Sequence, residues 1–186
     1  EERFGTPGLV FNNAGVQGEL LPVQDYPIDD FSFVMDVNVN GIFHVLLEAA
    51  QRMREAGLAG AIVNSASMAG VEGGANMPAY SASKGAVMSL TRSASKDLAP
   101  LGIRVNAISP AFIGEGLMWD RQVTRQAQAD TQYYSNDPAV VAEEMIGAVP
   151  MRRTGTLDEV AAAVIWLLSD ESSYVTGHNV IISGGI

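Results

Sequence analysis

Short apolar runs alternate along this chain with longer segments in which apolar residues recur at helical spacing. The apolar runs lie at 8–12, 61–65, 103–108 and 180–182. Between them, the spacing predicts helices from Asp29 to about Gly57, from Pro78 to about Ala99 and from Leu157 to Leu168. Short buried strands that alternate with long helices are typical of an α/β fold with a parallel sheet. No repeat, low-complexity tract or linker interrupts the pattern, so we expect a single domain.

The remaining segments read as loops and one excursion from the alternating pattern. A long loop with two prolines is expected at 16–28, and a glycine-rich loop with Gly70, Gly73 and Gly74 precedes the helix at Pro78. Residues 110–150 are punctuated by prolines, and short helices are expected there near 117–129 and 138–148. The first residues, Glu1 to Gly5, read as the end of a helix.

Composition excludes several classes of site. The chain has 186 residues, a net charge of −10 and no cysteine. The negative charge disfavours nucleic acid, and the lack of cysteine excludes disulfides and thiolate metal sites. His44 and His178 have no second ligand at metal spacing, so we expect no metal. Apolar runs end well short of a membrane span and no signal peptide is visible, so we expect no membrane partner and a cytoplasmic location.

Tyr80 and Lys84 are the sharpest chemical feature. They are four residues apart on one predicted helix, so both side chains lie on the same face. An ammonium one turn from a phenol favours the phenolate. A Tyr that acts as acid and base near neutral pH needs its pKa lowered by roughly 3 units. By itself the pair also fits an ordinary helix with both side chains at its surface.

Two further polar residues stand in unusual places. Ser67 follows the strand predicted at 61–66, and ligands of parallel sheets bind at the carboxyl ends of the strands. Its hydroxyl there could donate to a substrate oxygen, or it could bond its own backbone as loop serines do. Asn38 lies inside an otherwise apolar helical segment, in Val37-Asn38-Val39-Asn40-Gly41. Because Asn and Gly are poor helix formers, the pattern suggests a kink or a buried polar role, although a surface asparagine fits it equally well.

These residues occur in the order and spacing of a known family. Asn12-Asn13-Ala14-Gly15, Asn38, Ser67, Tyr80 and Lys84, followed by Pro110-Ala111-Phe112-Ile113 and the stretch from Gly177 to Gly185, resemble the short-chain dehydrogenase/reductase family over essentially the whole chain. The resemblance implies a Rossmann-like doubly wound parallel sheet. It also implies an enzyme that moves hydride between a nicotinamide dinucleotide and a small-molecule alcohol or carbonyl.

The resemblance also implies a role for each matching residue. Tyr80 would be the acid/base at the alcohol oxygen, and Lys84 would hold the nicotinamide ribose and lower the Tyr80 pKa. Ser67 would hydrogen-bond the substrate oxygen, and Asn38 would support a proton-relaying water. The residues implied to lie along the cofactor are Asn12, Ala14, Gly15, Tyr80, Lys84, Pro110 and Ile113.

The sequence departs from the family pattern at several points. The glycine-rich turn that cradles the pyrophosphate is not in these 186 residues, nor is the residue that chooses between NAD and NADP. We therefore expect residues 1–186 to be the C-terminal two-thirds of one such domain, N-terminally incomplete, with NAD as cofactor and NADP not excluded. Ala111 replaces the usual glycine, and Glu115 stands near where a threonine often meets the carboxamide.

Other stretches bear on the substrate. Residues 22–27, 67–70, 116–122 and 148–153 resemble bacterial xylitol dehydrogenases and related polyol dehydrogenases. The predicted reaction is oxidation of a small polyol such as xylitol to its ketose. Met68, Met77, Met118 and Met151 are predicted to line a substrate pocket or to fill the core. Trp119 and Trp166 are expected in packing or subunit contacts, and the family resemblance implies a homotetramer.

Two alternative functions remain open. One is a reductase of ketones or 3-oxoacyl carriers, which the acidic chain disfavours because only Arg121, Arg125, Arg152 and Arg153 offer basic charge near the site. The other is a truncated, non-catalytic interaction module. The intact set of Asn38, Ser67, Tyr80 and Lys84 argues against that module.

Overall fold

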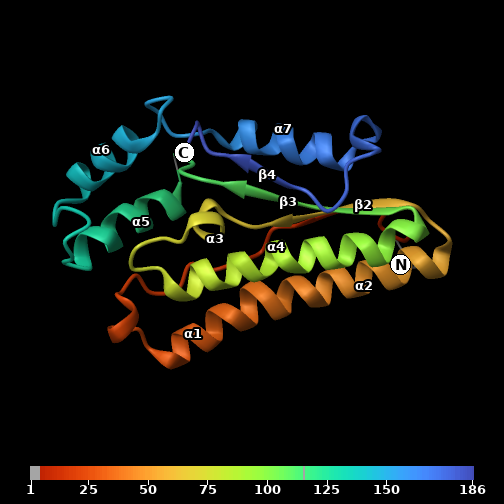
Figure 1. Cartoon of the computed structure of the whole chain (residues 1–186), viewed down its shortest axis with the longest axis horizontal. Coiled ribbons are helices and arrows are strands. Elements are labelled where there is room, and N and C mark those ends of the chain that lie inside the picture. The colour runs from red at the N-terminus through yellow and green to blue at the C-terminus, as the bar shows by residue number, and fades with distance from the viewer. Residues whose placement is uncertain (1–4, 115) are drawn as a thin grey trace.

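A four-stranded parallel sheet forms the centre of the molecule (Figure 1). The computed structural model describes residues 5–114 and 116–186, so the expectations for Glu1–Phe4 and Glu115 lie outside the described residues. The strands are β1 Leu9–Asn12, β2 Gly60–Ser65, β3 Ile103–Pro110 and β4 Asn179–Ile182, in the order β1-β2-β3-β4. Val10 pairs with Ile62, Ile62 with Val105, and Ile108 with Val180. The predicted parallel sheet is confirmed.

Helices cover both faces of this sheet, which explains why β2 and β3 are buried along most of their length and not only at every second residue. One face carries α4 (Pro78–Leu98) and a long helix made of α1 (Ile28–Met35), a π-helical turn (Asp36–Asn40) and α2 (Gly41–Ala56). The other carries α7 (Leu157–Leu168), as Figure 1 shows. Short 3-10 turns occupy Val23–Asp25, Ala99–Leu101 and Asp170–Ser172.

Each face of the sheet has its own apolar core. On the α2 and α4 side, Met53, Ile62 and Ile103 belong to one buried cluster. On the α7 side, Val63 and Ile108 pack with Val164 and Leu167. The central strands β2 and β3 contribute to both clusters, so burial of these two strands holds the layers together.

The ends of the helices follow local chemistry. Gly57 ends α2 in the left-handed conformation at φ 63°, which glycine adopts without steric cost. Pro78 occupies the first turn of α4, where its missing N–H has no partner to lose. Thr156 caps α7 through a capping box with Glu159. These signals explain why the predicted helix boundaries agree closely with the observed ones.

The segment after β2 corrects one expectation. The glycine-rich stretch at 70–74 was expected to be a loop, but Met68–Glu72 forms a short helix, α3. Ser67 caps it, because its Oγ accepts a hydrogen bond from the Ala69 N–H at 3.2 Å. Gly70 brings α3 close to α4: a Cβ at Gly70 would lie 2.6 Å from the carbonyl carbon of Lys84. Gly70 therefore permits close helix packing and does not mark a turn.

The predicted excursion forms two short helices beyond the carboxyl ends of the strands. They are α5 (Leu117–Gln128) and α6 (Pro138–Ala148), which confirms both expected helices. Val123 and Ala127 of α5 pack against Val141 and Met145 of α6. In Figure 1 the pair projects past the sheet on the side to which the arrowheads of β3 and β4 point. It is therefore placed to wall a site at that edge.

Within the described ranges, one continuous helix, Ile28–Ala56, is long and apolar enough to cross a membrane by length and composition. We had expected no such segment because no uninterrupted apolar run is long enough. The mean hydropathy of its most apolar window is 1.2, although polar residues interrupt it. Core helices pass the same test, and Val34, Ile42 and Met53 of this helix are buried in the protein. The absence of a membrane partner stays a prediction.

Candidate active site

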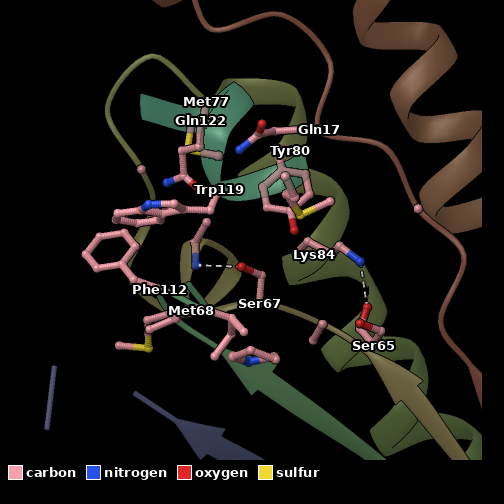
Figure 2. A pocket seen from close by; sticks show the side chains of 18 of the residues that line it. Gln17, Ser65, Ser67, Met68, Met77, Tyr80, Lys84, Phe112, Trp119 and Gln122 are labelled. Atoms are coloured by element: carbon pink, nitrogen blue, oxygen red, sulfur yellow. Dashed lines mark hydrogen bonds between the residues drawn. The ribbon is translucent and has the colours of Figure 1, made fainter. Parts of the chain in front are cut away.

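A cavity of about 700 Å³ opens at the carboxyl ends of β2 and β3 (Figure 2). Its walls come from the loop after β1, the end of β2 with α3, the first turns of α4, the segment after β3, and α5. Among the residues predicted for the site, those that line this cavity are Ala14, Gly15, Ser67, Tyr80, Lys84, Pro110 and Ile113. The structure thus gathers side chains from five segments at the edge of the sheet where ligands of parallel α/β proteins bind.

Tyr80 lies in the first turn of α4 and its phenol points toward Ser67 (Figure 2). Burial raises the pKa of the phenol, while hydrogen bonding to the Ser67 side chain acts in the opposite direction. The expected lowering of this pKa by Lys84 is not among these causes and stays a prediction. The Lys84 ammonium lies 5.6 Å from the centre of the Tyr80 ring, so it is near the π-face of the ring.

Lys84 is held one turn further along α4. Its side chain is almost fully buried, with 3% of the residue exposed, and its Nζ donates a hydrogen bond to the carbonyl oxygen of Ser65 at 2.7 Å. Burial lowers the pKa of Lys84 to about 8. The last carbonyl of β2 therefore orients a cation whose charge depends on pH in the neutral to alkaline range.

This lowered pKa predicts a pH dependence of stability. Between about pH 8 and the ordinary value of 10.5 the unfolded chain holds one proton more at Lys84 than the folded chain, so stability rises with pH in that window. We expect the free energy of unfolding of the parent protein, relative to Lys84→Met, to increase by on the order of 2 kcal/mol from pH 7.5 to pH 10. Urea unfolding across that range measures it.

The matched control for this pH prediction is Lys96→Met, an exposed lysine on the same helix. Its difference from the parent protein should not vary with pH in this window. Parallel pH profiles for Lys84→Met and the parent protein would show that Lys84 titrates normally when folded.

Asn38 lies in the π-helical turn and is fully buried. Its Oδ1 accepts from the N–H of Val16 at 2.8 Å, and its Nδ2 donates to the carbonyl of Val16 at 2.8 Å and to Ser83 Oγ at 3.0 Å. The expected kink or buried polar role is confirmed, since the extra residue of a π turn places this amide under the loop after β1. The water relay assigned to Asn38 by resemblance stays a prediction.

The loop after β1 passes very close to these groups. A Cβ on Gly15 would lie 3.1 Å from Asn38 Oδ1 and 3.3 Å from Lys84 Nζ. Glycine is therefore the residue that lets this backbone approach the floor of the cavity. Ala14 and Gly15 line the cavity, and their predicted contact with a cofactor stays a prediction.

Asn12 is placed differently from what its assigned role suggests. Its side chain does not line the cavity: Nδ2 donates to the carbonyl of Ile42 at 2.9 Å and to Asn64 Oδ1 at 3.3 Å. Asn64 in turn donates to Thr91 Oγ1 at 3.0 Å. This chain of buried amides joins β1 and β2 to the helices beneath. Because the side chain is used in these bonds, only the backbone of Asn12 would be able to contact a dinucleotide.

The outer wall of the cavity contains residues that sequence reasoning did not assign. Phe112 and Trp119 pack with ring centres 6.0 Å apart and planes tilted by 60°. Trp119 therefore lines the cavity and also packs against Phe112. Of the four methionines predicted to line a substrate pocket or to fill the core, Met68, Met77 and Met118 line this cavity and Met151 does not. Gln17 and Gln122 also line it, and their amides hydrogen-bond to no other described residue. Trp119, Gln122 and Gln126 are spaced so that they share one face of the predicted helix, and this spacing could have indicated from the sequence that the face lines a cavity.

The part of the chain that the structure describes contains no group of three or more His, Cys, Asp or Glu residues able to hold a metal. His44 instead packs at a tilt against Phe43, with ring centres 6.3 Å apart. The polar side chains that line the cavity are hydroxyl, phenol, ammonium and amide groups, together with the carboxylate of Glu72.

Comparison with known proteins gives consistent relatives. A family model described as enoyl-(acyl carrier protein) reductase matches residues 1–186. Levodione reductase of Leifsonia aquatica is 38% identical over 184 residues, covering 99% of this chain and 66% of that protein. Cyclohexanol dehydrogenase of an Acinetobacter species is 35% identical, covering 97% and 64%. The chain therefore spans about two-thirds of the length of the curated relatives it matches.

A solved structure resembles the chain more closely. The crystal structure of NAD+-bound xylitol dehydrogenase is 54% identical, with a TM-score of 0.96, and the match covers 99% of this chain and 70% of that one. The parallel sheet with helices on both faces is a Rossmann-like α/β fold. The chain belongs to the short-chain dehydrogenase/reductase family.

Proposed function

We propose that the protein is an oxidoreductase that transfers hydride between a nicotinamide dinucleotide and a secondary alcohol or its ketone. The observation that carries this proposal is the convergence of Ser67, Tyr80 and Lys84 on one cavity at the carboxyl edge of the sheet. When bound, the dinucleotide supplies the hydride acceptor or donor. The close backbone at Gly15 and the buried Lys84 ammonium fit a ribose and nicotinamide there. NAD is the proposed form, supported by the NAD+-bound xylitol dehydrogenase.

Residues of this chain transfer the proton and stabilise the charge on the substrate oxygen. In oxidation, the substrate hydroxyl loses its proton to the oxygen of Tyr80, and in reduction the phenol returns it. Ser67 donates a hydrogen bond to the same substrate oxygen and so stabilises the charge that develops there. Because burial raises the pKa of Tyr80, positive charge near the phenol is needed before it acts as a base at neutral pH. Lys84, fixed by the Ser65 carbonyl, supplies part of that charge while it is protonated.

The proposed substrate is a small polyol, with xylitol first. The identity of 54% to a xylitol dehydrogenase supports it. The amides of Gln17 and Gln122 support it as well, since they face the cavity with free donors and acceptors that polyol hydroxyls can engage. The Phe112–Trp119 wall favours a second candidate, an apolar cyclic ketone or alcohol, as the names of the levodione and cyclohexanol enzymes suggest.

The test is a substrate panel with protein expressed from its complete coding sequence. Polyols of three to six carbons and cyclic ketones are offered with NAD(H) or NADP(H), and absorbance of the reduced nicotinamide is followed. We expect xylitol with NAD to give the highest kcat/KM. Turnover of cyclic ketones without polyols would select the second candidate, and no turnover of any member would contradict the reductase and dehydrogenase assignments together.

We also propose that the protein is a homotetramer. The long helix α1–α2 leaves apolar side chains of Phe33, Phe43, Val45 and Leu47 exposed, and α7 leaves Ile165 and Trp166 exposed. Exposed apolar patches on separate faces are typical of subunit interfaces. Light scattering measures the mass in solution, and a monomer at micromolar concentration would contradict the proposal.

A further inference from the structure

Asn76, four residues before Tyr80, lies directly behind the wall of the cavity, between Ala75 and Met77, which line it. It lies between α3 and α4, is 6% exposed and adopts φ +64°, in the left-handed region that few non-glycine residues enter. Asn tolerates this conformation better than other residues. Its side chain is buried although the residue carries no part of the proposed proton transfer.

The contacts of Asn76 join three walls of the cavity. Its Nδ2 donates to Gln126 Oε1 at 2.9 Å and to Thr131 Oγ1 at 3.1 Å. Gln126 returns a hydrogen bond from Nε2 to the carbonyl of Ala75 at 3.3 Å. The backbone carbonyl of Asn76 accepts from the N–H of Leu21 at 2.9 Å. The segment before Tyr80, the loop after β1 and α5 therefore meet at one buried residue, Asn76.

Gln126 connects this junction to the substrate side of the cavity. It is 2% exposed and lies on α5 one turn after Gln122 and two turns after Trp119, so the three side chains share a helix face. All three line the cavity. The two hydrogen bonds between Gln126 and residues 75–76 fix how far this face of α5 stands from Tyr80.

We propose that Asn76 and Gln126 form a positioning pair that fixes α5 over the cavity and thereby sets which substrates place a carbinol carbon at Tyr80. The proposal rests on the proposed function for its substrate. The pair acts through Trp119 and Gln122 and does not touch the reacting atoms. It therefore governs substrate binding and size selection more than the chemical step or cofactor binding.

Two substitutions test the pair from opposite sides. Asn76→Gly keeps the left-handed backbone and the bond from Leu21 while removing the amide, and Gln126→Leu removes the partner at similar volume. Because misplacement by about 1 Å can cost 10²-fold, we expect kcat/KM for the preferred substrate to fall about 10- to 100-fold, mainly through KM. The KM for the dinucleotide should stay unchanged. Discrimination between the preferred substrate and one a carbon longer should fall, and the double variant should be no worse than either single one.

A second readout does not depend on turnover. In a background where Trp166 and any tryptophan outside these 186 residues are replaced by Phe, the emission of Trp119 reports the position of α5, since Trp119 and Trp166 are the two tryptophans of these residues. We expect acrylamide quenching of Trp119 to increase in Asn76→Gly and Gln126→Leu. This readout tests the pair even if the substrate panel rejects the proposed function, so the two failures are distinguishable.

Matched controls separate positioning from general loss of stability. Gln128→Leu makes the same change at an exposed site of α5 and should alter neither KM nor quenching. Met53→Ala, in the remote core beside Ile62, should lower Tm while KM and discrimination stay as in the parent protein. If Asn76→Gly and Gln126→Leu lower only Tm, as Met53→Ala does, or raise the KM of dinucleotide and substrate alike, the positioning role is overturned.

Discussion

Replacing Tyr80 with Phe is expected to lower kcat by about 10²–10⁴-fold, the range typical of a lost general acid or base. The ring and its packing in α4 are kept, and only the hydroxyl that faces Ser67 is lost. KM for the dinucleotide should change little, because Lys84 keeps its bond to Ser65. Steady-state kinetics on the preferred member of the substrate panel measures the effect.

The matched control for this substitution is Tyr174→Phe, which removes a phenol that is fully exposed to solvent. It should retain the kinetic constants of the parent protein. If Tyr80→Phe keeps more than about a tenth of the parent kcat on every substrate, then Tyr80 is not the acid/base, since that loss is below the range expected for such a role.

Replacing Gly70 with Ala is expected to damage both stability and turnover. The added Cβ would lie 2.6 Å from the carbonyl carbon of Lys84 and 2.7 Å from the nitrogen of Gly85, so it meets backbone that cannot move aside. Overpacking of this kind costs about 1–3 kcal/mol. Because Ser67 caps α3, displacement of α3 also moves the hydroxyl, and a shift of about 1 Å can lower kcat about 10²-fold. Urea unfolding and steady-state kinetics measure the two effects.

Gly147→Ala is the matched control for Gly70→Ala. Gly147 lies in α6 with no atom within 4 Å of an added Cβ, so alanine there should stabilise the helix by about 0.5–1 kcal/mol and leave kcat unchanged. A Gly70→Ala variant as stable and active as the parent protein would mean that α3 can withdraw from α4 freely, and that the position of Ser67 is not set by this contact.

The elements that sequence predicts well are those whose signals are local. The helix of α7 is bounded by a capping box at Thr156 and Glu159, and its predicted range agrees with Leu157–Leu168. Tyr80 and Lys84 share a helix face by spacing alone, and their place in the cavity follows once the helix is known. The strands β2 and β3 are buried along most of their length because both faces are covered, and the run Ala61-Ile62-Val63 makes this visible in the sequence.

Features set by tertiary contacts are the ones that sequence missed. Gly70 reads as a loop residue, but its role depends on backbone atoms of Lys84 and Gly85 that only packing brings near. Burial raises the pKa of Tyr80, and burial depends on packing that the spacing of Tyr80 and Lys84 in the sequence does not reveal. The pairing of Asn76 with Gln126 spans fifty residues of chain and carries no local pattern.

The π-helical turn at Asp36–Asn40 has a consequence for protein engineering. A widened turn of this kind is rarer than ordinary α-helix and frequently occurs at functional sites. Computational redesign for heat resistance would favour helix-forming residues over Asn38, Asn40 and Gly41, or remove one residue to restore regular winding. Either change would withdraw the amide that supports the loop at Val16. A thermostable library of this protein should therefore hold this segment constant and seek its gains in α6 and on the exposed faces of the other helices.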